Sequence, residues 1–208
     1  MTGAIRESYE KHHREGGRYG FTFGSQARLA FFDRALPGAC TILDLGSRDG
    51  TLLGRLQRPG RRFVGLDIDG VALARASAVP QVSVALANLW SGLPIRSGSV
   101  DAVLAGEFLE HTPDPWLVAR EVARVLTPRG VFVGSVPNAS RLRNRIRFLA
   151  GRTVEVDRTH LHSFSPELLS ECLRDAGFVA TIEFLESRML RLHPRLMGNT
   201  MVFRAVRA

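Results

Sequence analysis

Two aspartates and two glycines have the spacing that points most directly to ligand chemistry. Asp44, Gly46 and Gly50 lie in ILDLGSRDG, residues 42–50, where a short apolar run passes through a tight loop into a helix-like stretch. Gly46 permits a sharp turn with positive φ, and Gly50 lets the helix begin close to the strand. The loop N–H groups and the helix N-terminus favour a carboxylate or a phosphate. Asp67 ends the next apolar run, where an acid can accept both hydrogens of a ribose diol.

A dinucleotide is the obvious rival ligand for this loop, but the glycine pattern disfavours it. GxGxxG needs a middle glycine so that the backbone can approach a pyrophosphate, and this chain has Arg48 there. The Asp44 carboxylate at the end of the strand would repel a pyrophosphate and would suit an ammonium group. S-adenosylmethionine carries an ammonium, a carboxylate and a sulfonium cation, so we predict that it is the cofactor.

Asn88 follows the third apolar run by a few residues. Its amide can both donate and accept hydrogen bonds, which suits an adenine edge, although a turn residue is an equally good interpretation. We include Ile68 and Leu89, the neighbours of Asp67 and Asn88, in the predicted site. The predicted cofactor-binding residues are Asp44, Gly46, Arg48, Gly50, Asp67, Ile68, Asn88 and Leu89.

A second group of polar side chains follows the fourth and fifth apolar runs. Glu107, Glu110 and His111 come in EFLEH, and His160 and His162 come in DRTHLHSF. Carboxylates and imidazoles could converge on one divalent ion: oxygen ligands favour Mg²⁺ or Mn²⁺, and imidazoles also allow Zn²⁺ or Fe²⁺. Without a metal, His111 or His160 would act as general base toward a hydroxyl, and we place Glu110 in the same catalytic group. A purely structural role, such as capping a helix, is the third interpretation.

These residues require a framework that alternates strands and helices. The runs read as strands are Thr41–Leu45, Arg62–Leu66, Gln81–Ala85, Val100–Ala105, Gly130–Val136, Val179–Glu186 and Thr200–Val206. The first five are short, β-branched and apolar on both faces, as in a buried parallel sheet. Helices are predicted at Ser25–Leu36, Gly50–Gln57, Gly70–Ala78, Asp114–Leu126, Asn138–Ala150 and Ser165–Ala176. This alternation predicts a doubly wound, mostly parallel seven-stranded α/β sheet, with the last two strands pairing antiparallel at one edge because no crossover helix separates them.

The chain has 208 residues, which suits one domain with a single core. Residues 1–24 are polar and glycine-rich without a regular period, so we predict an N-terminal arm or lid there and a single domain over residues 25–208. No apolar run reaches the roughly 20 residues of a membrane span, and Met1–Arg14 lacks the apolar stretch of a signal peptide. We therefore expect a cytoplasmic protein without a membrane partner. Cys40 and Cys172 lack CxxC partners, so buried free thiols are expected.

The formal net charge is +8, and almost all of the positive charge is arginine. The densest stretch contains Arg141, Arg143, Arg145, Arg147 and Arg152. On a helix these form stacked i,i+4 pairs. A solvated helix face and a docking surface for an acidic ligand are both compatible with this pattern.

The motifs as a set resemble the successive motifs of class I S-adenosylmethionine-dependent methyltransferases. They are ILDLGSRDG, FVGLDID, LPIRSGSVDAVLAGEFLEH, LTPRGVFVGSVPN and HLHSFSPELLSECLRDAGF, and they cover roughly Thr41 to Val179. The resemblance implies a Rossmann-like fold, and within the superfamily the chain is similar to small-molecule and sugar O-methyltransferases. The family pattern D/E-x-G-x-G-x-G is matched at Asp44, Gly46 and Gly50, whereas Arg48 departs from it. Asn88 stands where the family often has Asp.

The E-x-x-E-H spacing with a downstream H-x-F resembles two branches of that superfamily. These are the small-RNA 3′-terminal 2′-O-methyltransferases and the ubiquinone-biosynthesis O-methyltransferases. Carried over by position, the resemblance implies Glu107, Glu110, His111 and His162 as metal ligands. The metal would bind substrate hydroxyls and lower the pKa of the one that attacks.

We therefore expect methyl transfer from S-adenosylmethionine to a hydroxyl of a small polar acceptor, such as a sugar, a glycan end or a natural-product intermediate. RNA 2′-O-methylation that uses the arginine-rich stretch is an alternative, disfavoured because the chain shows no RNA-binding module. A non-catalytic, cofactor-sensing or partner-binding protein on the same fold is a third hypothesis, since SVPNASRLRNRIRFLAGR resembles MetW-like proteins of methionine metabolism. The acceptor and the oligomeric state stay open.

Overall fold

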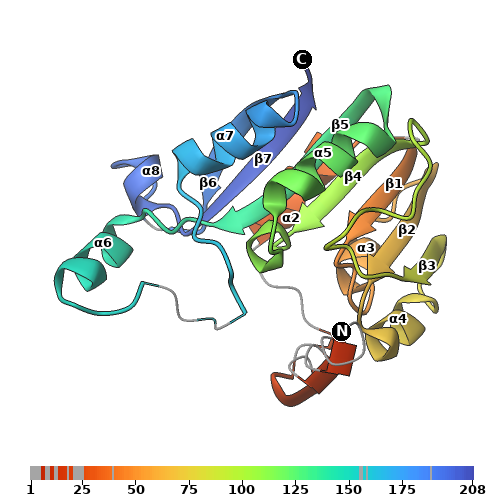
Figure 1. Cartoon of the computed structure of the whole chain (residues 1–208), viewed down its shortest axis with the longest axis horizontal. Coiled ribbons are helices and arrows are strands. Elements are labelled where there is room, and N and C mark those ends of the chain that lie inside the picture. The colour runs from red at the N-terminus through yellow and green to blue at the C-terminus, as the bar shows by residue number, and fades with distance from the viewer. Residues whose placement is uncertain are drawn as a thin grey trace.

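In the computed structural model the chain forms one seven-stranded sheet (Figure 1). The structure describes residues 6–7, 10–11, 14–17, 19–20, 26–38, 40–154, 157, 159–187 and 189–208. The spatial order of the strands is β3-β2-β1-β4-β5-β7-β6. Their bounds are β1 Cys40–Leu45, β2 Arg61–Asp67, β3 Val82–Leu86, β4 Val100–Gly106, β5 Leu126–Pro137, β6 Phe178–Leu185 and β7 Thr200–Arg207.

The first five strands are parallel to one another, and β7 runs antiparallel to both β5 and β6. The predicted mostly parallel sheet with antiparallel C-terminal strands is therefore confirmed. Strand β7 inserts between β5 and β6, so that β6 forms the outer edge. The chain builds outward from β1 to β3 and then returns to β4 beside β1. In open α/β sheets such a reversal creates the crevice in which ligands bind.

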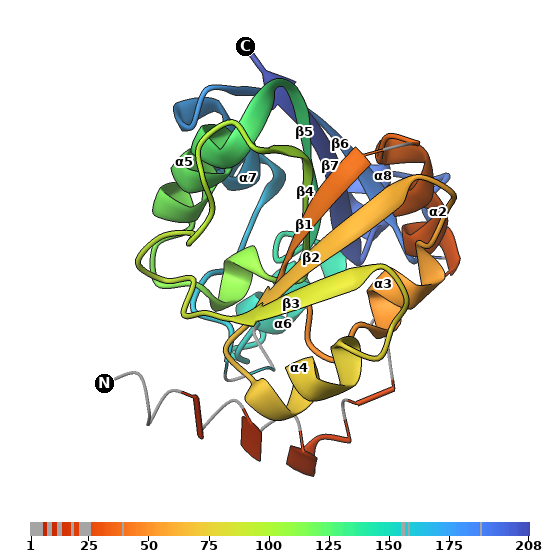
Figure 2. The ribbon, with the colours of Figure 1, turned by 90° about the vertical axis from the view of Figure 1, so that its right-hand side faces the viewer.

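Helices cover both faces of the sheet (Figure 2). Their bounds are α2 Gln26–Ala35, α3 Thr51–Arg55, α4 Gly70–Ala76, α5 Pro115–Val125, α6 Leu142–Leu149, α7 Pro166–Asp175 and α8 Pro194–Met197. Buried residues of α5 and α7 pack in one apolar cluster, and those of α2 and α3 pack in the other. Helices α5 and α7 begin with proline after a capping residue: the side chains of Asp114 and Ser165 accept from the N–H groups of Leu117 and Leu168.

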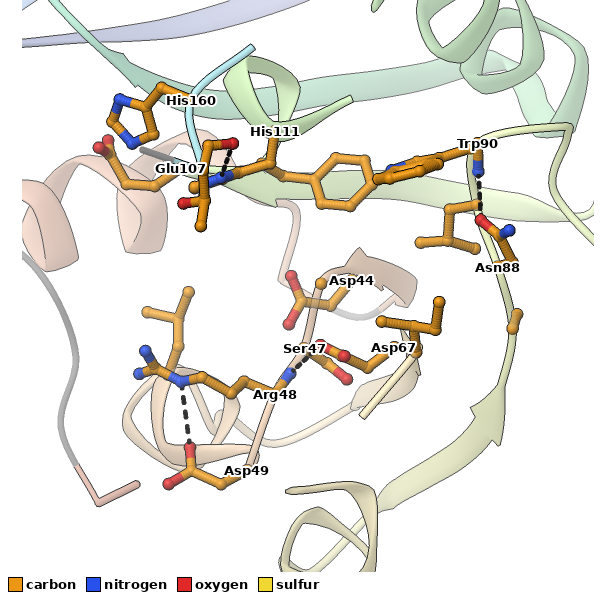
Figure 3. Close-up of a pocket in the computed structure, with 18 of the residues that line it drawn as sticks. Asp44, Ser47, Arg48, Asp49, Asp67, Asn88, Trp90, Glu107, His111 and His160 are labelled. Atoms are coloured by element: carbon orange, nitrogen blue, oxygen red, sulfur yellow. Dashed lines mark hydrogen bonds and ion pairs between the residues drawn. The ribbon is translucent and has the colours of Figure 1, made fainter. Parts of the chain in front are cut away.

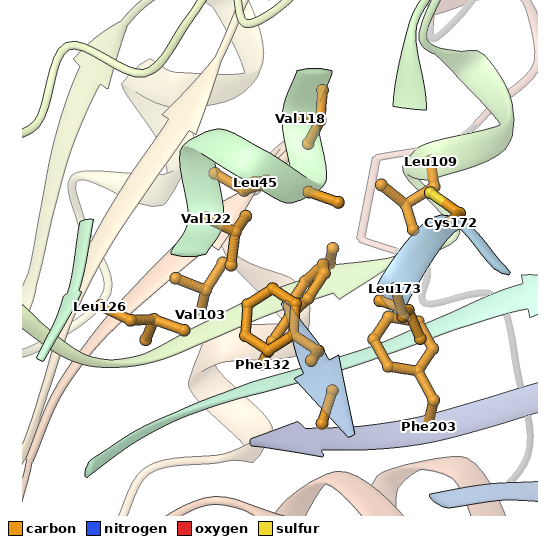
Figure 4. Packing of buried hydrophobic residues seen from close by; sticks show 14 of the residues in the cluster. Leu45, Val103, Leu109, Val118, Val122, Leu126, Phe132, Cys172, Leu173 and Phe203 are labelled. Atoms are coloured by element: carbon orange, nitrogen blue, oxygen red, sulfur yellow. The ribbon is translucent and has the colours of Figure 1, made fainter. Parts of the chain in front are cut away.

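The core on the α5 and α7 face is built from aliphatic and aromatic side chains of these two helices and of the strands beneath them (Figure 4). Phe132 on β5 meets Phe203 on β7 edge to face, with ring centroids 5.0 Å apart. Cys172 of α7 is fully buried in the same cluster, and Cys40 is buried on the opposite face. Both are free thiols, as predicted.

Four features differ from the sequence prediction. Strand β5 already begins at Leu126, directly after α5. The helix expected from residue 138 begins at Leu142, because Asn138 is buried and its amide donates to the carbonyls of Arg195 and Gly198 instead of continuing a helix. The short helix α8 and the 3₁₀ turn η1, Leu109–His111, were not predicted. Among the described helices, none is both long and apolar enough to cross a bilayer.

The predicted arm lies partly outside the described residues, including the stretch 21–25. Its described part passes below α4 in Figure 2. The Tyr19 hydroxyl donates to Asp69 Oδ2 at 2.9 Å, and the Gly20 N–H donates to the Asp49 carboxylate. The Arg75 guanidinium stacks over the Tyr19 ring at 4.4 Å. The arm therefore contacts the domain beside the loop of residues 46–50.

Candidate functional site

The carboxyl ends of β1, β2 and β4 open into a cavity of about 270 Å³ (Figure 3). Seven of the eight predicted cofactor-binding residues line it; the exception is Gly50. The histidines His111 and His160 line it as well, from η1 and from the segment that precedes α7. Lining residues that the sequence did not single out include Arg28, Ser47, Asp49, Trp90, Phe108, Asp157 and Thr159. The two separate motif groups therefore face one cavity.

The two glycines of the first loop are required by its backbone. Gly46 has φ +73°, and a Cβ there would lie 2.8 Å from Cδ2 of Phe108. Gly50 has φ +72°, and its Cβ would lie 3.0 Å from the backbone of Ala76. Both positions combine a left-handed conformation with close packing, so glycine is the residue that fits. Gly50 acts by packing α3 against α4 rather than by touching the cavity.

Arg48 occupies the position at which the family pattern has a glycine, and it adopts φ +50°. A non-glycine residue in the left-handed region costs about 1–2 kcal/mol. The backbone thus keeps the glycine conformation although the side chain has changed. The Arg48 N–H donates to Asp67 Oδ2 at 2.8 Å, and its Nε lies 3.8 Å from Asp49 Oδ1. The Arg48 side chain lines the cavity with Asp49 beside it, while its backbone is bonded to Asp67.

Asp44 and Asp67 supply two buried carboxylates at the ends of β1 and β2. Burial raises the pKa of Asp44 well above its usual value, the nearby Asp67 charge raises it further, and Arg48 partly offsets both. Each Asp67 oxygen accepts one backbone N–H, from Arg48 and from Asp69. These bonds hold the carboxylate in one orientation at the cavity wall. A cation bound beside Asp44 would stabilise the ionised form of this carboxyl group.

The opposite wall follows β3. Asn88 Oδ1 accepts from the Trp90 N–H at 3.1 Å, which is the turn role that the sequence left open, and Asn88 also lines the cavity. Ile68 and Leu89 line it beside Asn88. Trp90 contributes an aromatic surface that the sequence prediction missed (Figure 3). An indole directly after the Asn88 turn was the available signal.

Glu107 takes part in a polar network at the end of β4. Its Oε1 accepts from Ser135 Oγ at 2.8 Å and lies 3.2 Å from Arg28 Nη1. The desolvated surroundings raise the pKa of Glu107, and Arg28 and Ser135 oppose this shift. Arg28 is 5% exposed and comes from α2, far away in sequence, so its pairing with Glu107 could not be predicted. This network commits Glu107 to Arg28 and Ser135.

Glu110, His111 and His160 form a compact group in which one ligand atom of each lies within 4.8 Å of the others. Glu110 is 1% exposed, and the two imidazole rings meet edge to face with centroids 4.7 Å apart. His111 Nδ1 lies 3.1 Å from the Thr159 carbonyl oxygen. Because a carbonyl only accepts, Nδ1 carries the proton in this contact.

The structure does not bring the four predicted metal ligands together. His162 Nε2 lies 3.2 Å from the Pro113 carbonyl, and its ring packs near Trp116 and Phe164. Within the part of the chain that the structure describes, the residues placed to hold a metal are Glu110, His111 and His160, without Glu107 or His162. The H-x-H spacing explains the difference, because the loop presents His160 to the cavity and directs His162 toward α5.

Known proteins resemble this chain in sequence and in fold. Residues 43–134 match a family described as "Methyltransferase domain". A probable S-adenosylmethionine-dependent methyltransferase of Mycolicibacterium smegmatis is 34% identical over 138 residues, which make up 66% of this chain and 51% of the relative. The chain thus spans about half the length of the curated relatives it matches.

Two solved structures illustrate the fold and its range. One, described as a methyltransferase and possible histamine N-methyltransferase from Thermotoga maritima, superposes with a TM-score of 0.74 at 19% identity, over 96% of this chain and 98% of that one. The [4+2]-cyclase SpnF superposes with a TM-score of 0.67 at 20% identity, over 91% of this chain and 84% of that one. These likenesses establish a Rossmann-like methyltransferase fold.

Proposed function

We propose that this chain is a class I S-adenosylmethionine-dependent methyltransferase and that it transfers a methyl group to a hydroxyl of a small polar acceptor. A sugar, a glycan end or a natural-product intermediate would fit. The observation that carries the proposal is one cavity with buried carboxylates at one wall and His111 and His160 at another.

The cofactor's polar groups match the donors and acceptors of the cavity. Asp44, whose buried carboxyl favours a cation, would meet the ammonium of S-adenosylmethionine, and the Arg48 guanidinium would meet the carboxylate. Asp67 would accept from the ribose hydroxyls while its backbone bonds hold it in place. Ile68, Asn88, Leu89 and the Trp90 ring would enclose the adenine. Gly46 and Gly50 would shape the loop.

His111 is our candidate for the general base. Its Nδ1–H donates to Thr159, so Nε2 can take the proton of an acceptor hydroxyl. When bound, S-adenosylmethionine would supply an electrophilic methyl carbon; the acceptor oxygen would form the new C–O bond as the C–S bond breaks and its electron pair stays on sulfur. Glu110 and His160 would orient His111, and holding the hydroxyl in line would supply much of the rate.

A divalent metal is compatible with the same group. Glu110, His111 and His160 offer two imidazole nitrogens and one carboxylate, a set that suits Mn²⁺, Fe²⁺ or Zn²⁺ better than Mg²⁺. When bound, such an ion would lower the pKa of an acceptor hydroxyl. The metal and metal-free forms differ experimentally: a chelator abolishes activity only in the first, and Mn²⁺ restores it.

The arm would act as a lid. Tyr19 contacts Asp69, and Gly20 contacts Asp49 within the predicted cofactor loop. Closure would exclude water from the reacting groups.

Isothermal titration with S-adenosylmethionine tests the cofactor assignment. We expect binding by the wild type and at least tenfold weaker binding by Asp67→Ala, because one charge-assisted hydrogen bond contributes about 1.5–3 kcal/mol. Glu171→Ala, an exposed acidic residue on α7, is the matched control and should bind normally. Absent binding by the wild type, or equal binding by Asp67→Ala, would refute it.

The competing proposal is a non-methylating role on the same fold, because a cyclase also has this fold. Release of S-adenosylhomocysteine with any hydroxyl acceptor distinguishes the two. Binding of the cofactor without turnover across a panel of sugars and phenols would favour a non-methylating role.

A further inference from the structure

Helix α6, Leu142–Leu149, lies at one end of the molecule, outside the layers that cover the sheet (Figure 1). Its body-facing side is polar. Asn144 is 7% exposed, and its amide nitrogen lies 3.1 Å from the Ala139 carbonyl oxygen and 3.4 Å from that of Asn138. The helix is therefore held to the domain by hydrogen bonds rather than by an apolar stripe.

The apolar side of α6 faces solvent. Leu142, Ile146 and Leu149 occupy positions i, i+4 and i+7, which share the face opposite Asn144. Their exposed fractions are 37%, 57% and 84%, and the neighbouring Phe148 is 71% exposed. A surface helix normally turns its apolar stripe to the core, so this orientation is inverted. Such exposed apolar patches mark interaction sites.

The flanks of the stripe are positively charged. Arg143 and Arg147 lie on one side and Arg145 on the other, and α6 contains no acidic residue. The sequence had left this arginine-rich stretch either as a solvated face or as a docking surface for an acidic ligand. Exposed aliphatic side chains between arginines fit a partner that is apolar inside and anionic at its surface.

We propose that α6 docks on an anionic lipid bilayer, with Leu142, Ile146 and Leu149 entering the headgroup boundary and the arginines pairing with lipid phosphates. Amphipathic helices with Leu or Phe on one face and Lys or Arg on the other bind membranes in this way. A second copy of the chain would bring like charges together, and RNA would leave the aliphatic stripe without a matching surface. This proposed peripheral contact differs from the sequence-based expectation of no membrane partner, and none of the described helices could span a bilayer.

The segment that follows α6 carries Asp157, Thr159 and His160, which line the cavity wall. The proposed binding to lipid does not depend on the proposed methyl transfer, because binding to vesicles can be measured without any substrate.

Flotation with vesicles of phosphatidylcholine, alone or with part of it replaced by phosphatidylglycerol, tests the proposal. The full-length wild type should float with the anionic vesicles and much less with the neutral ones. Each aliphatic side chain withdrawn from water raises the vesicle partition coefficient about tenfold, so the double variant Ile146→Ser/Leu149→Ser should lower this coefficient by about a hundredfold. Arg143→Glu should lower it by about tenfold at low salt. Val179→Ser and Arg129→Glu, exposed elsewhere, are the matched controls and should float like the wild type.

Three results would overturn the proposal. The first is a wild type that does not float with anionic vesicles, and the second is a double variant that floats like the wild type. The third is a wild-type dimer, detected by sedimentation, that the double variant no longer forms. Because all substitutions are exposed, unchanged circular dichroism and cofactor binding should accompany the loss of flotation; failure of cofactor binding in the wild type would count against the proposed function alone.

Discussion

The Gly46→Ala substitution measures how much of the cofactor loop depends on glycine. Alanine at φ +73° costs about 1–2 kcal/mol because the left-handed region brings Cβ close to the following carbonyl oxygen. The new Cβ would also lie 2.8 Å from Cδ2 of Phe108, closer than side chains tolerate, and such overpacking costs about 1–3 kcal/mol. Lower entropy of the unfolded chain returns about 0.4–1 kcal/mol. We expect a net loss of about 2–4 kcal/mol.

Gly98→Ala separates the two contributions. Gly98 has φ +63°, but a Cβ there would meet nothing within 4 Å among the described residues. Only the conformational cost remains, so the loss should be about 1 kcal/mol. The difference between the two variants then reports the Phe108 contact.

Urea unfolding followed by circular dichroism gives both free energies, and titration with S-adenosylmethionine gives the functional effect. If Phe108 swings aside, it moves into the cavity wall that it lines, and cofactor affinity falls. Phe108→Leu in the Gly46→Ala background should recover part of the loss, with a coupling of about 1 kcal/mol or more in the double-mutant cycle. The reasoning fails if Gly46→Ala and Gly98→Ala are equally destabilised and both bind the cofactor normally.

Four further predictions address other residues of the cavity. Asp44→Asn should stabilise the free protein, and the gain should increase as the pH rises above 3.8, the ordinary pKa of aspartate, because burial raises the pKa of Asp44 in the folded state. Urea unfolding at several pH values measures this gain, and cofactor binding should weaken. Arg48→Gly should keep the loop stable within about 1 kcal/mol by removing a strained φ, yet weaken cofactor binding if the guanidinium holds the carboxylate. His111→Gln should lower kcat by about a hundredfold to ten-thousandfold with unchanged cofactor affinity, whereas His162→Gln should retain most activity. The Tyr19 phenol should ionise with a pKa of about 12, because burial and Asp69 raise it. In a spectrophotometric titration this ionisation should be seen in the wild type and be absent from Tyr19→Phe.

The strands were predictable because their signals are local. Each buried strand is a short β-branched run, each turn is marked by Gly, Pro, Asn or Asp, and the absence of a crossover helix before Thr200 predicts antiparallel pairing of the last two strands. The position of β7 between β5 and β6 was not predicted. The start of α6 was mispredicted because a tertiary contact decides it. Asn138 caps carbonyls near α8, a segment far along the chain, and no local pattern carries that information.

The proposed cofactor-binding residues and the other residues of the cavity also differ in how far local sequence patterns predict them. Asp44, Gly46 and Asp67 stand at strand ends, and the topology of a parallel sheet brings strand ends together, so motif spacing was enough to predict that they share a cavity. Arg28 and Trp90 carry no motif, and their places follow only from packing.

The histidine group shows where spacing stops being informative. His160 and His162 lie two residues apart in an irregular segment, and which one reaches the cavity depends on backbone anchoring. The N–H groups of Leu161 and His162 both donate to the Glu110 carbonyl, at 2.7 and 3.1 Å, which fixes this segment against η1. That anchor leaves His160 beside His111 and turns His162 toward Pro113. Glu110 therefore connects the two halves of the site through its backbone carbonyl, which a substitution would leave in place, as well as through its buried carboxylate beside His160.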